Sequence, residues 1–126
     1  LHCQKAVAGE PLRVVADQVG CPTATAGLAG ACWRLIERQL GGVMHWSDAG
    51  AASWYDFAVA IGEFAEDSGQ LEHAAQVQPI SSADYPTPAQ RPAYSLLDCT
   101  SSRELLGLKP THWRQALQEV IADVGT

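Results

Sequence analysis

The sequence predicts a small α/β domain in which a mixed sheet is flanked by helices. Short runs rich in β-branched residues alternate along the chain with longer stretches of helical apolar periodicity, the pattern typical of this class. The 126 residues suit a single domain, because a chain of this length can bury a real core. Hydrophobic residues make up 47% and charged residues 17%, an ordinary globular balance.

The first part of the chain contains two predicted strands and one complete helix. Residues 1–9 have the pattern of the last turns of a helix, with Gly9 suited to the left-handed position just past its end. No N-cap precedes them, so we expect a helix already in progress and therefore a truncated chain. A β-branched run predicts a strand at 12–16. Apolar residues at helical spacing predict a helix over 24–40, and the apolar run 42–46 predicts a buried strand.

The second part begins with a helix whose start is marked by its own side chains. Ser53 is a suitable N-cap, and Asp56 three residues later can complete a capping box. A one-sided apolar stripe predicts that this helix continues to about Ser68. The elements predicted beyond it are a strand at 75–80, a proline-containing loop at 81–94, a strand at 95–98, and helices at 100–106 and 111–124.

Charge and hydropathy exclude several classes of partner. The net charge is -6 and the eight Lys and Arg residues are scattered, whereas nucleic-acid binding needs clustered cations. No apolar stretch approaches the roughly 20 residues that a membrane span requires, and the first residues lack the apolar run of a signal peptide. We therefore expect neither nucleic acid nor a membrane as a partner.

The four cysteines predict no zinc site. Cys3, Cys21, Cys32 and Cys99 lie far apart, without the paired spacing that zinc sites use. Cys32 is expected to be a small buried hydrophobic residue of its helix, and a disulfide pair remains an open alternative. Because nothing else in the sequence indicates secretion, the expected location is cytoplasmic.

No catalytic, cofactor or metal site is predicted within this chain. A dinucleotide fold needs a glycine-rich turn after a strand, where the backbone approaches the pyrophosphate, and the sequence has none. Cys21 follows a glycine next to a helix start and is a candidate nucleophile, but we favour a small loop residue. His45 is interpreted as a core histidine rather than a base. The other histidines share no metal-ligand spacing: His2, His73 and His112.

Arg91 is the strongest candidate for ligand binding. It lies between prolines that restrict the backbone, and a planar guanidinium suits bidentate contact with phosphate oxygens. The alternative is a surface arginine paired with Asp84 or Asp98, and the residues alone favour neither interpretation.

The aromatic residues divide into two groups. Trp33, Trp54 and Trp113 occur at helical spacing with other apolar residues, so we expect them in the core. Trp46 and Tyr94 border loops and offer a flat face with a polar group, which suits the wall of a sugar or base pocket. For Trp46 the core is the favoured interpretation.

Four segments, in order and at matching spacing, resemble the C-terminal part of dTDP-4-dehydrorhamnose reductases. They are RVVADQVGCPT (13–23), GVMHWSDAGAASWYDFA (42–58), PISSADYPTPAQRPAYSLLD (79–98) and HWRQAL (112–117). The Tyr-Pro-Thr-Pro-Ala-x-Arg-Pro run is the most specific of them. The resemblance extends essentially from end to end. It implies that residues 1–126 form one substrate-binding domain, the C-terminal portion of an extended short-chain dehydrogenase without its Rossmann half.

The resemblance also implies an activity and a site. The family reduces dTDP-4-dehydro-L-rhamnose to dTDP-L-rhamnose with NADPH or NADH, and its Tyr-x-x-x-Lys catalytic pair and Rossmann portion lie N-terminal to the matched region. This chain alone is therefore expected to be non-catalytic and to bind a dTDP-sugar only weakly. Arg91 would contact the nucleotide diphosphate. The other residues expected to border the pocket are Gln18, Gly20, Pro22, Thr23 and Tyr94.

Departures from the family pattern shape the remaining expectations. Some relatives carry an acidic residue, linked to magnesium-assisted dimer contacts, early in the helix after the Pro-Thr pair. Residues 24–27 here are Ala-Thr-Ala-Gly, so no such metal site is expected. Where relatives often have a lysine after the Leu-Asp pair, this chain has Cys99 to Ser102. The alternative function is a free-standing nucleotide-sugar-binding or protein-interaction module. Because 42–46 would be an apolar edge strand without its usual partner, we also expect a homo-oligomer.

Overall fold

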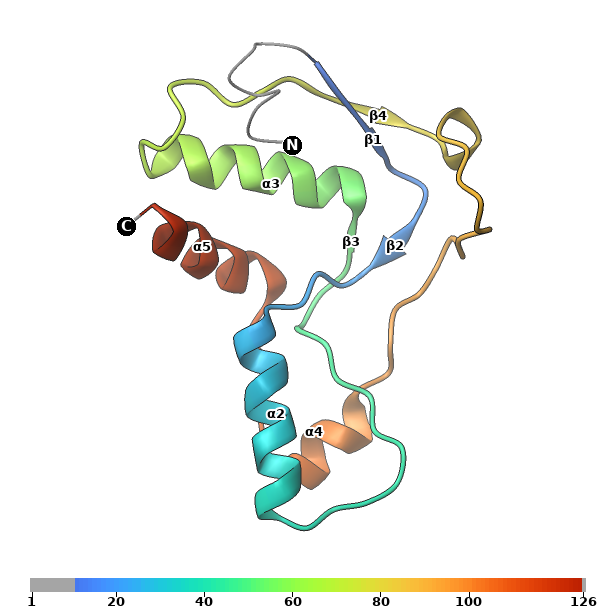
Figure 1. Ribbon diagram of the computed structural model, residues 1–126, viewed down its shortest axis with the longest axis vertical. Helices are drawn as coiled ribbons and strands as arrows, with labels where there is room; N and C mark the ends of the chain where they lie inside the picture. Colours follow the sequence, from blue (N-terminus) through green and yellow to red (C-terminus); the bar gives the residue numbers. More distant parts are fainter. Residues whose placement is uncertain (1–10, 126) are drawn as a thin grey trace.

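The computed structural model describes residues 11–125, so the helix expected over 1–9 lies outside the described residues. In chain order the elements are β1 (Leu12–Val15), β2 (Val19–Gly20), α2 (Thr25–Glu37), β3 (Ala52–Ser53), α3 (Trp54–Asp67), β4 (Val77–Ile80), the 3-10 turn η1 (Ser82–Asp84), α4 (Thr100–Leu106) and α5 (Trp113–Val124). In Figure 1, α3, α5 and the β1–β4 pair gather at one end of the molecule, and α2 and α4 form the other end. The predicted α/β class is confirmed.

The strands form two small sheets rather than one. β1 and β4 are parallel, with Leu12 opposite Val77 and Val15 opposite Ile80. Parallel neighbours need a long crossover, and here the crossover contains α2, β3 and α3. β2 and β3 are antiparallel, with Val19 opposite Ser53. The predicted mixture of parallel and antiparallel strands is present, divided between two sheets with flanking helices.

The start of α3 follows the prediction from its side chains. The Asp56 amide donates to the Ser53 hydroxyl at 3.1 Å, and the Ser53 amide donates to the Asp56 carboxylate at 2.8 Å. Both bonds of a capping box are therefore made. Because Ser53 is also the last residue of β3, the box joins strand to helix without an intervening loop and fixes where the first turn of α3 lies. The helix ends at Ser68, as predicted.

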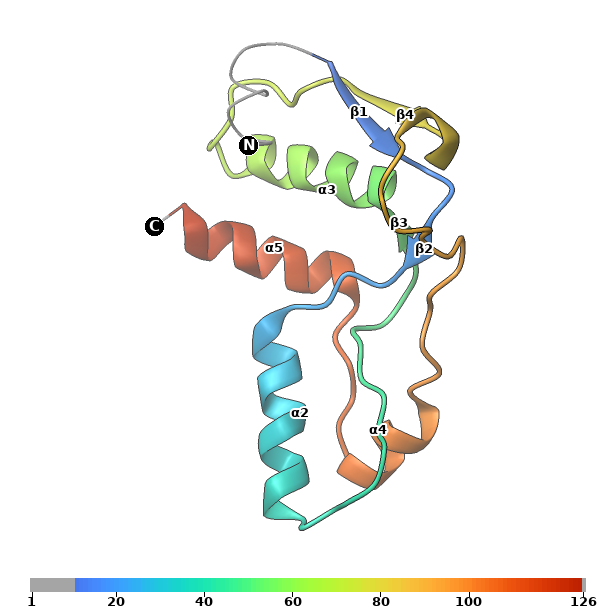
Figure 2. The same cartoon turned by 45° about the vertical axis from the view of Figure 1, so that its right-hand side comes forward.

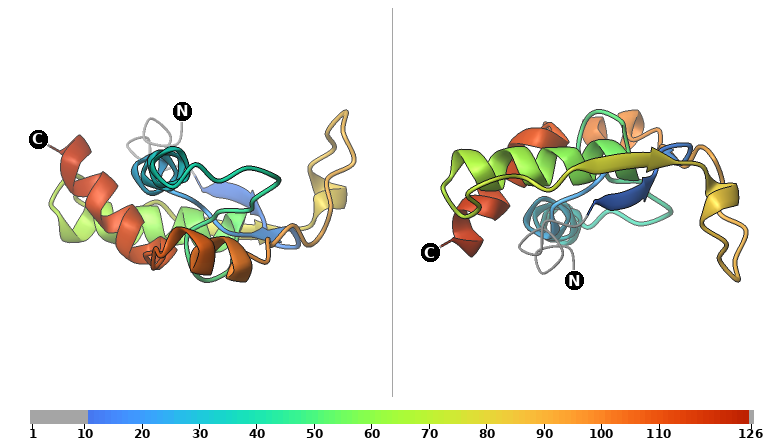
Figure 3. Two further views of the ribbon diagram at one scale, coloured as in Figure 1. Left: turned by 90° about the horizontal axis from the view of Figure 1, so that it is seen from below. Right: turned by 90° about the horizontal axis from the view of Figure 1, so that it is seen from above.

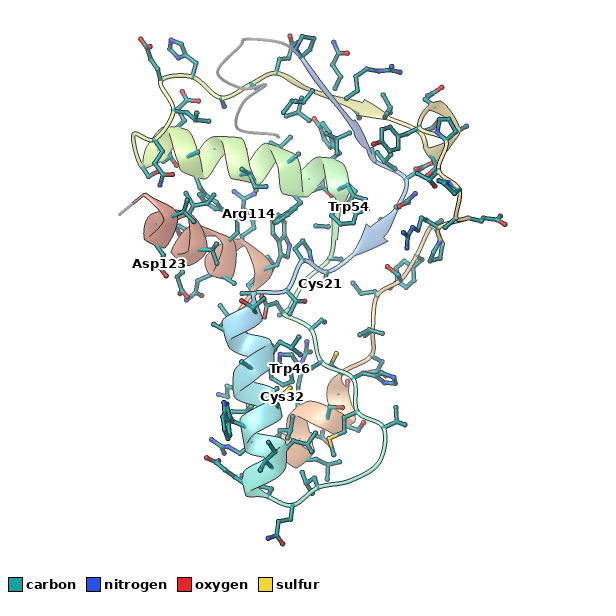
Figure 4. The ribbon with its side chains drawn as sticks, viewed as in Figure 1. Cys21, Cys32, Trp46, Trp54, Arg114 and Asp123 are labelled. Atoms are coloured by element: carbon teal, nitrogen blue, oxygen red, sulfur yellow. The ribbon has the colours of Figure 1, made fainter. Side chains whose placement is uncertain are left out.

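The core lies between α3 and α5. Its buried members are Ala52, Ala60, Trp113, Leu117 and Ile121, with Phe57, Ile61 and Phe64 packed against them. Arg114 lies in the gap between the two helices (Figure 4), where it forms a 2.7 Å ion pair with Glu63. Its guanidinium also lies 5.0 Å from the centre of the Phe64 ring. The apolar cluster, the ion pair and the cation–π contact together hold the helices as one unit.

Two predicted strands are wrong. Residues 42–46 and 95–98 have no strand structure, and the Val43 side chain is 89% exposed. A strand is stable only when a neighbour pairs with its backbone, and among the described residues no strand lies beside 42–46. In the second segment only Ser95 pairs with a strand, through its amide. The apolar composition of both segments favours a strand locally but cannot supply the pairing partner.

Several apolar side chains expected in the core are exposed. The Trp33 side chain is 67% exposed, that of Ile36 is 63% exposed, and Cys32 is exposed as well. Ala31 is the one buried residue of α2. α2 contacts α4. In Figure 3, α2 is seen along its axis, whereas α3 and α5 are seen from the side. The periodicity of 24–40 predicted the helix correctly, but the expected burial of its stripe is wrong. His45, expected in the core, is also exposed.

The proline-containing loop leaves the body of the molecule, as Figure 3 shows. It begins with η1, in which the Ser81 hydroxyl donates to the Asp84 carboxylate at 2.9 Å. From Tyr85 to Pro92 the chain is exposed and has no regular structure, because the three prolines restrict the backbone and cannot donate hydrogen bonds. The predicted extended, surface-following course is thus confirmed beyond the η1 turn.

Candidate functional site

A cavity of about 680 Å³ opens where β2, β3, the start of α3 and the end of the proline-containing loop meet. This volume is in the range of small-molecule sites. Figure 2 shows these segments side by side, although they are far apart in the sequence. The lining residues are Gln18, Val19, Gly20, Cys21, Pro22, Thr23, Ala52, Ser53, Trp54, Phe57, Arg91, Pro92 and Ser95.

Five of the six residues expected to border a substrate pocket line this cavity. Gln18, Gly20, Pro22 and Thr23 come from the segment 18–23, which contains β2. The fifth is Arg91, from the proline-containing loop. The sixth, Tyr94, does not line it: its side chain is 68% exposed, while its neighbours on both sides, Ala93 and Ser95, bond to β2 through their backbone. Trp46 also lies away from the cavity.

Val19 holds the cavity together because its backbone is paired on both sides. On one side it lies opposite Ser53 of β3. On the other side the Val19 amide donates to the Ala93 carbonyl at 2.8 Å, and the Ser95 amide donates to the Val19 carbonyl at 2.9 Å. A two-residue strand thus connects the first turn of α3 with the segment that carries Arg91.

Gly20 leaves room for the Ser95 side chain beside this pairing. A Cβ atom at position 20 would lie 3.0 Å from the Ser95 hydroxyl oxygen, a tighter contact than most side chains make. A larger residue would require the Ser95 side chain to move, because that side chain lies against the glycine. The glycine therefore makes room for the Ser95 hydroxyl, although its φ angle is ordinary.

The root of the proline-containing loop is bonded to the turn after β1. Both carboxylate oxygens of Asp17 accept from the Ser82 amide at 2.9 Å, and one also accepts from the Ser82 hydroxyl at 2.6 Å. The Gln18 amide nitrogen donates to the same Ser82 hydroxyl oxygen at 3.0 Å. Residues 17–19 therefore hold both ends of the loop that carries Arg91, at Ser82 and at Ala93.

Arg91 is the one charged residue among the described residues that line the cavity. Within residues 11–125 it forms no hydrogen bond or ion pair. The two carboxylates considered as its surface partners bond elsewhere: Asp84 to the Ser81 hydroxyl, and Asp98 to the Thr100 amide at 3.0 Å. The guanidinium is thus free to meet an anion, in a chain whose net charge is -6.

Thr23 and a buried carboxylate fix the floor of the cavity. The Thr23 hydroxyl donates to the Cys21 carbonyl at 3.1 Å and accepts from the Asp48 amide at 3.3 Å. Asp48 is 3% exposed, and its carboxylate accepts from the Ala24 amide at 2.9 Å, at the start of α2. A carboxylate is stabilised there by the unpaired amides and the helix dipole. Asp48 thereby holds the Pro22–Thr23 turn in place.

Cys21 has the features of a structural residue. Its thiol donates to the Asp48 carbonyl at 3.0 Å, and burial, together with the nearby Asp48 charge, raises the pKa of the thiol above its ordinary value. Only the thiolate is a good nucleophile, so a raised pKa favours the interpretation as a small loop residue over the nucleophile. Figure 4 shows it on the chain just after β2.

Sequence reasoning missed the wall that α3 contributes. Trp54, labelled in Figure 4, lies in the first turn of α3 and is 56% exposed, whereas its helical spacing predicts a place in the core. Phe57, three residues later, packs against the core and also lines the cavity. Spacing places both on one side of the helix but does not identify what that side meets. The capping box was the available signal, because it marks a helix start next to a strand end.

Other classes of site find no support in the described part of the chain. Residues 11–125 contain no group of three or more His, Cys, Asp or Glu side chains that could hold a metal ion. No described helix has both the length and the apolar character needed to cross a membrane. Cys21, Cys32 and Cys99 are free thiols.

The bonds from Ser82 predict the titration of Asp17. They lower the pKa of its carboxyl group below the ordinary 3.8, chiefly through the Ser82 hydroxyl and then through the Ser82 amide. Because the folded pKa is lowered, the carboxylate stabilises the fold above pH 3.8, and this contribution is lost as the pH falls through the folded value. We expect Ser82→Ala to return the pKa part of the way to 3.8 in a carboxyl-carbon NMR titration. Ser81→Ala, which removes a bond to Asp84 instead, should leave it unchanged; equal pKa values in wild type and Ser82→Ala would contradict the assignment.

Comparison with known proteins places the chain in a family. The model of the RmlD substrate binding domain matches residues 2–126. A dTDP-4-dehydrorhamnose reductase of Aggregatibacter actinomycetemcomitans is 38% identical over 117 residues, which cover 88% of this chain and 40% of that protein. The chain thus spans about 40% of the length of this curated relative.

Solved structures agree with the sequence comparison. The crystal structure of a dTDP-4-dehydrorhamnose reductase from Clostridium acetobutylicum superposes with a TM-score of 0.88 at 32% identity, covering 99% of this chain and 42% of that one. The enzyme of that name from Bacillus anthracis, in complex with NADP, gives a TM-score of 0.80 at 32% identity, covering 90% and 38%. From the family match, the sequence identity and these superpositions, it follows that the chain belongs to the RmlD substrate binding domain family.

Proposed function

We propose that the cavity binds the nucleotide-sugar substrate of a dTDP-4-dehydrorhamnose reductase and that Arg91 binds its diphosphate. The observation that carries the proposal is a single unpaired cation in the wall of a cavity of about 680 Å³. A guanidinium forms charge-assisted, bidentate bonds with phosphate oxygens. Family membership supports the ligand class, because the matching model is a substrate binding domain and the relatives are named for a dTDP-sugar.

The remaining walls suit the uncharged rings of such a ligand. Trp54 and Phe57 offer aromatic faces, on which a pyrimidine or the carbon face of a sugar stacks. Thr23, Ser53 and Ser95 supply hydroxyl groups for hydrogen bonds. Polar groups in an otherwise apolar wall fix the orientation of a small ligand, and this combination is typical of such sites.

Binding by these 126 residues alone is proposed to be weak. The relatives are more than twice as long, and residues outside this stretch would bury the side of the ligand that faces away from the cavity. A ligand that stays half in solvent forfeits much of the apolar burial that contributes to affinity. The proposed unit is one substrate-binding domain, with a cytoplasmic location expected from the free thiols of the described cysteines, Cys21, Cys32 and Cys99.

The residues present do not fit a nicotinamide dinucleotide. Such a cofactor places its pyrophosphate against the open N-terminus of a helix. The start of α2 is already occupied by the Asp48 carboxylate, and the start of α3 by that of Asp56. Both carboxylates would repel a phosphate. We therefore propose that NADPH or NADH, and the acid that protonates the sugar, belong to parts of the full-length family outside these residues.

A polypeptide of these 126 residues should show no reductase activity. Hydride transfer needs a positioned nicotinamide and an acid near the substrate carbonyl, and among the described residues no Asp, Glu, His, Tyr or Lys lines the cavity. The measurement is the absorbance of NADPH during incubation with dTDP-4-dehydro-L-rhamnose. Turnover well above the protein-free control would contradict the proposed division of roles.

Arg91→Ala should weaken dTDP-sugar binding about 10- to 100-fold, which corresponds to about 1.5–3 kcal/mol for a charge-assisted hydrogen bond. Calorimetric or NMR titration with dTDP-L-rhamnose measures the change. Arg91→Lys should recover only part of the affinity, because an ammonium cannot form the bidentate contact.

Arg13→Ala is the matched control for this titration. Arg13 carries the same charge and is exposed on β1, but it does not line the cavity, so its removal should leave the affinity nearly unchanged. Equal effects of Arg13→Ala and Arg91→Ala would mean that only net charge matters, and equal affinities of wild type and Arg91→Ala would make Arg91 an ordinary surface residue.

Self-association is proposed on a corrected basis. Residues 42–46 form no edge strand, but they leave Val43 89% exposed, and α2 exposes Trp33 and Ile36 next to them in the chain. A contiguous exposed apolar patch marks an interaction site, and we propose that these side chains, which are close in the chain, form one. We expect a homodimer or a larger assembly in which Val43 is covered, together with Met44 and Trp46.

Light scattering at micromolar concentration tests this expectation with two matched variants. Val43→Lys should shift the protein toward the monomer, because a charged amine cannot be buried between apolar surfaces. Val124→Lys should not, although Val124 is also an exposed valine (77%), because it lies at the end of α5 away from α2. A wild-type protein that is monomeric at every concentration would show the expectation to be wrong.

A further inference from the structure

The bonds among Asp17, Gln18 and Ser82 have a fixed direction. An ionised carboxylate can only accept, and the Ser82 hydroxyl lies 2.6 Å from the Asp17 oxygen, so its single hydrogen is donated to Asp17. The Ser82 oxygen can then only accept from Gln18. The atom of Gln18 that faces Ser82 is therefore its amide nitrogen, at 3.0 Å, and the side-chain amide cannot rotate by half a turn without losing this bond.

Orientation of the amide decides what Gln18 offers to the cavity. Gln18 is half-buried and lines the cavity, and its carbonyl oxygen has no hydrogen-bond partner among the described residues. A side-chain carbonyl held in this way is an acceptor. It would pair with a donor of the ligand and would leave an acceptor of the ligand without a partner.

We propose that Asp17 and Ser82 are positioning residues that make Gln18 a fixed hydrogen-bond acceptor for an N–H or O–H group of the bound nucleotide sugar. The inference rests on the proposed function of the cavity. The donors assigned to Gln18 are the imide N–H of the thymine ring or a hydroxyl of the sugar, which lie on opposite sides of the diphosphate. The third donor of a dTDP-sugar, the 3′-hydroxyl of the deoxyribose, is common to all the probes used below and would give no preference among them. Arg91 meets the diphosphate between them, so Gln18 would distinguish ligands by their donors and Arg91 would bind them by their charge.

The hydrogen-bonded series of Asp17, Ser82 and Gln18 is called the relay below. Its surroundings support a positioning role. Ser82 begins η1, whose own backbone is fixed by the bond from Asp84 to the Ser81 carbonyl at 3.1 Å. Asp17 lies two residues past the end of β1, and the Ala16 amide between them donates to the Ile80 carbonyl at 2.9 Å. The two partners of the relay are therefore attached to the ends of paired strands, β1 and β4, and not to a free loop.

The test compares three probes with different donors. Thymidine diphosphate has the imide N–H, N3-methylthymidine diphosphate lacks it, and dTDP-L-rhamnose adds the hydroxyl groups of the sugar. Dissociation constants are measured by NMR titration, which suits weak binding. In the wild type we expect a preference of about tenfold either for thymidine diphosphate over its N3-methyl form or for dTDP-L-rhamnose over thymidine diphosphate, according to which donor meets Gln18.

Substitutions in the relay should change this preference more than the overall affinity. Ser82→Ala should reduce the preference to about onefold, because the Gln18 amide can then rotate. Ser82→Thr keeps the hydroxyl and should keep the preference, a rescue that a merely structural role of the residue would not explain. Asp17→Asn leaves Ser82 in place but removes its obligatory acceptor, and should act like Ser82→Ala. Ser81→Ala is the neutral neighbour.

The outcomes separate this inference from the proposed function. If Ser82→Ala and Asp17→Asn keep the wild-type preference while Arg91→Ala weakens all three probes, the relay is overturned and the proposed function stands. A wild type without any preference among the probes also overturns the relay. If the wild type binds none of them at millimolar concentration, the proposed function fails, and the inference fails with it. Should Ser82→Ala not fold, which its amide spectrum would reveal, Asp17→Asn decides.

Discussion

The double pairing of Val19 is the interaction on which the rest of the site depends. Its amide and carbonyl both bond to the end of the proline-containing loop, and on its other side it lies opposite Ser53 of β3, so one residue sets the distance between the first turn of α3 and the segment of Arg91. Gly20 leaves room for the Ser95 side chain beside this pairing, because a Cβ at position 20 would lie 3.0 Å from the Ser95 hydroxyl oxygen. The capping box at Ser53 fixes the start of α3, so Trp54 lies at the wall of the cavity.

At the cavity, charge is distributed so that an anion would meet a single cation of the described chain, Arg91. Two helix N-termini near the cavity, which would otherwise attract phosphate, already hold the carboxylates of Asp48 and Asp56. Asp17 and Asp84 bond to serines of the loop root, and Asp98 bonds to the start of α4. With the nearby carboxylates engaged, Arg91 is left without a partner in the described chain, although the protein as a whole is acidic.

The molecule is uneven in how well its ends are packed. α3 and α5 share a buried cluster that includes Trp113, and an ion pair and a cation–π contact reinforce it. α2 buries only Ala31 and exposes Trp33, and the segment after it exposes Val43. This contrast matches the comparisons, in which the relatives extend well beyond the part that this chain covers. Exposed apolar side chains such as Trp33 and Val43 are expected where another protein surface packs against them.

What the sequence determined by itself is local. The capping box at Ser53, the helical periods and the turn-forming prolines act between residues a few positions apart, so each could be predicted from neighbouring residues, and the family could be identified from ordered motifs. Arg91 and residues of the 18–23 segment could be predicted as binding residues from the sequence. Their place in one cavity together with Trp54 could not. Tertiary structure decided that, as it decided that 42–46 is not a strand and that Trp33 faces solvent. Strand pairing and burial depend on partners far away in the sequence, and a local pattern carries the preference for a partner without the partner itself.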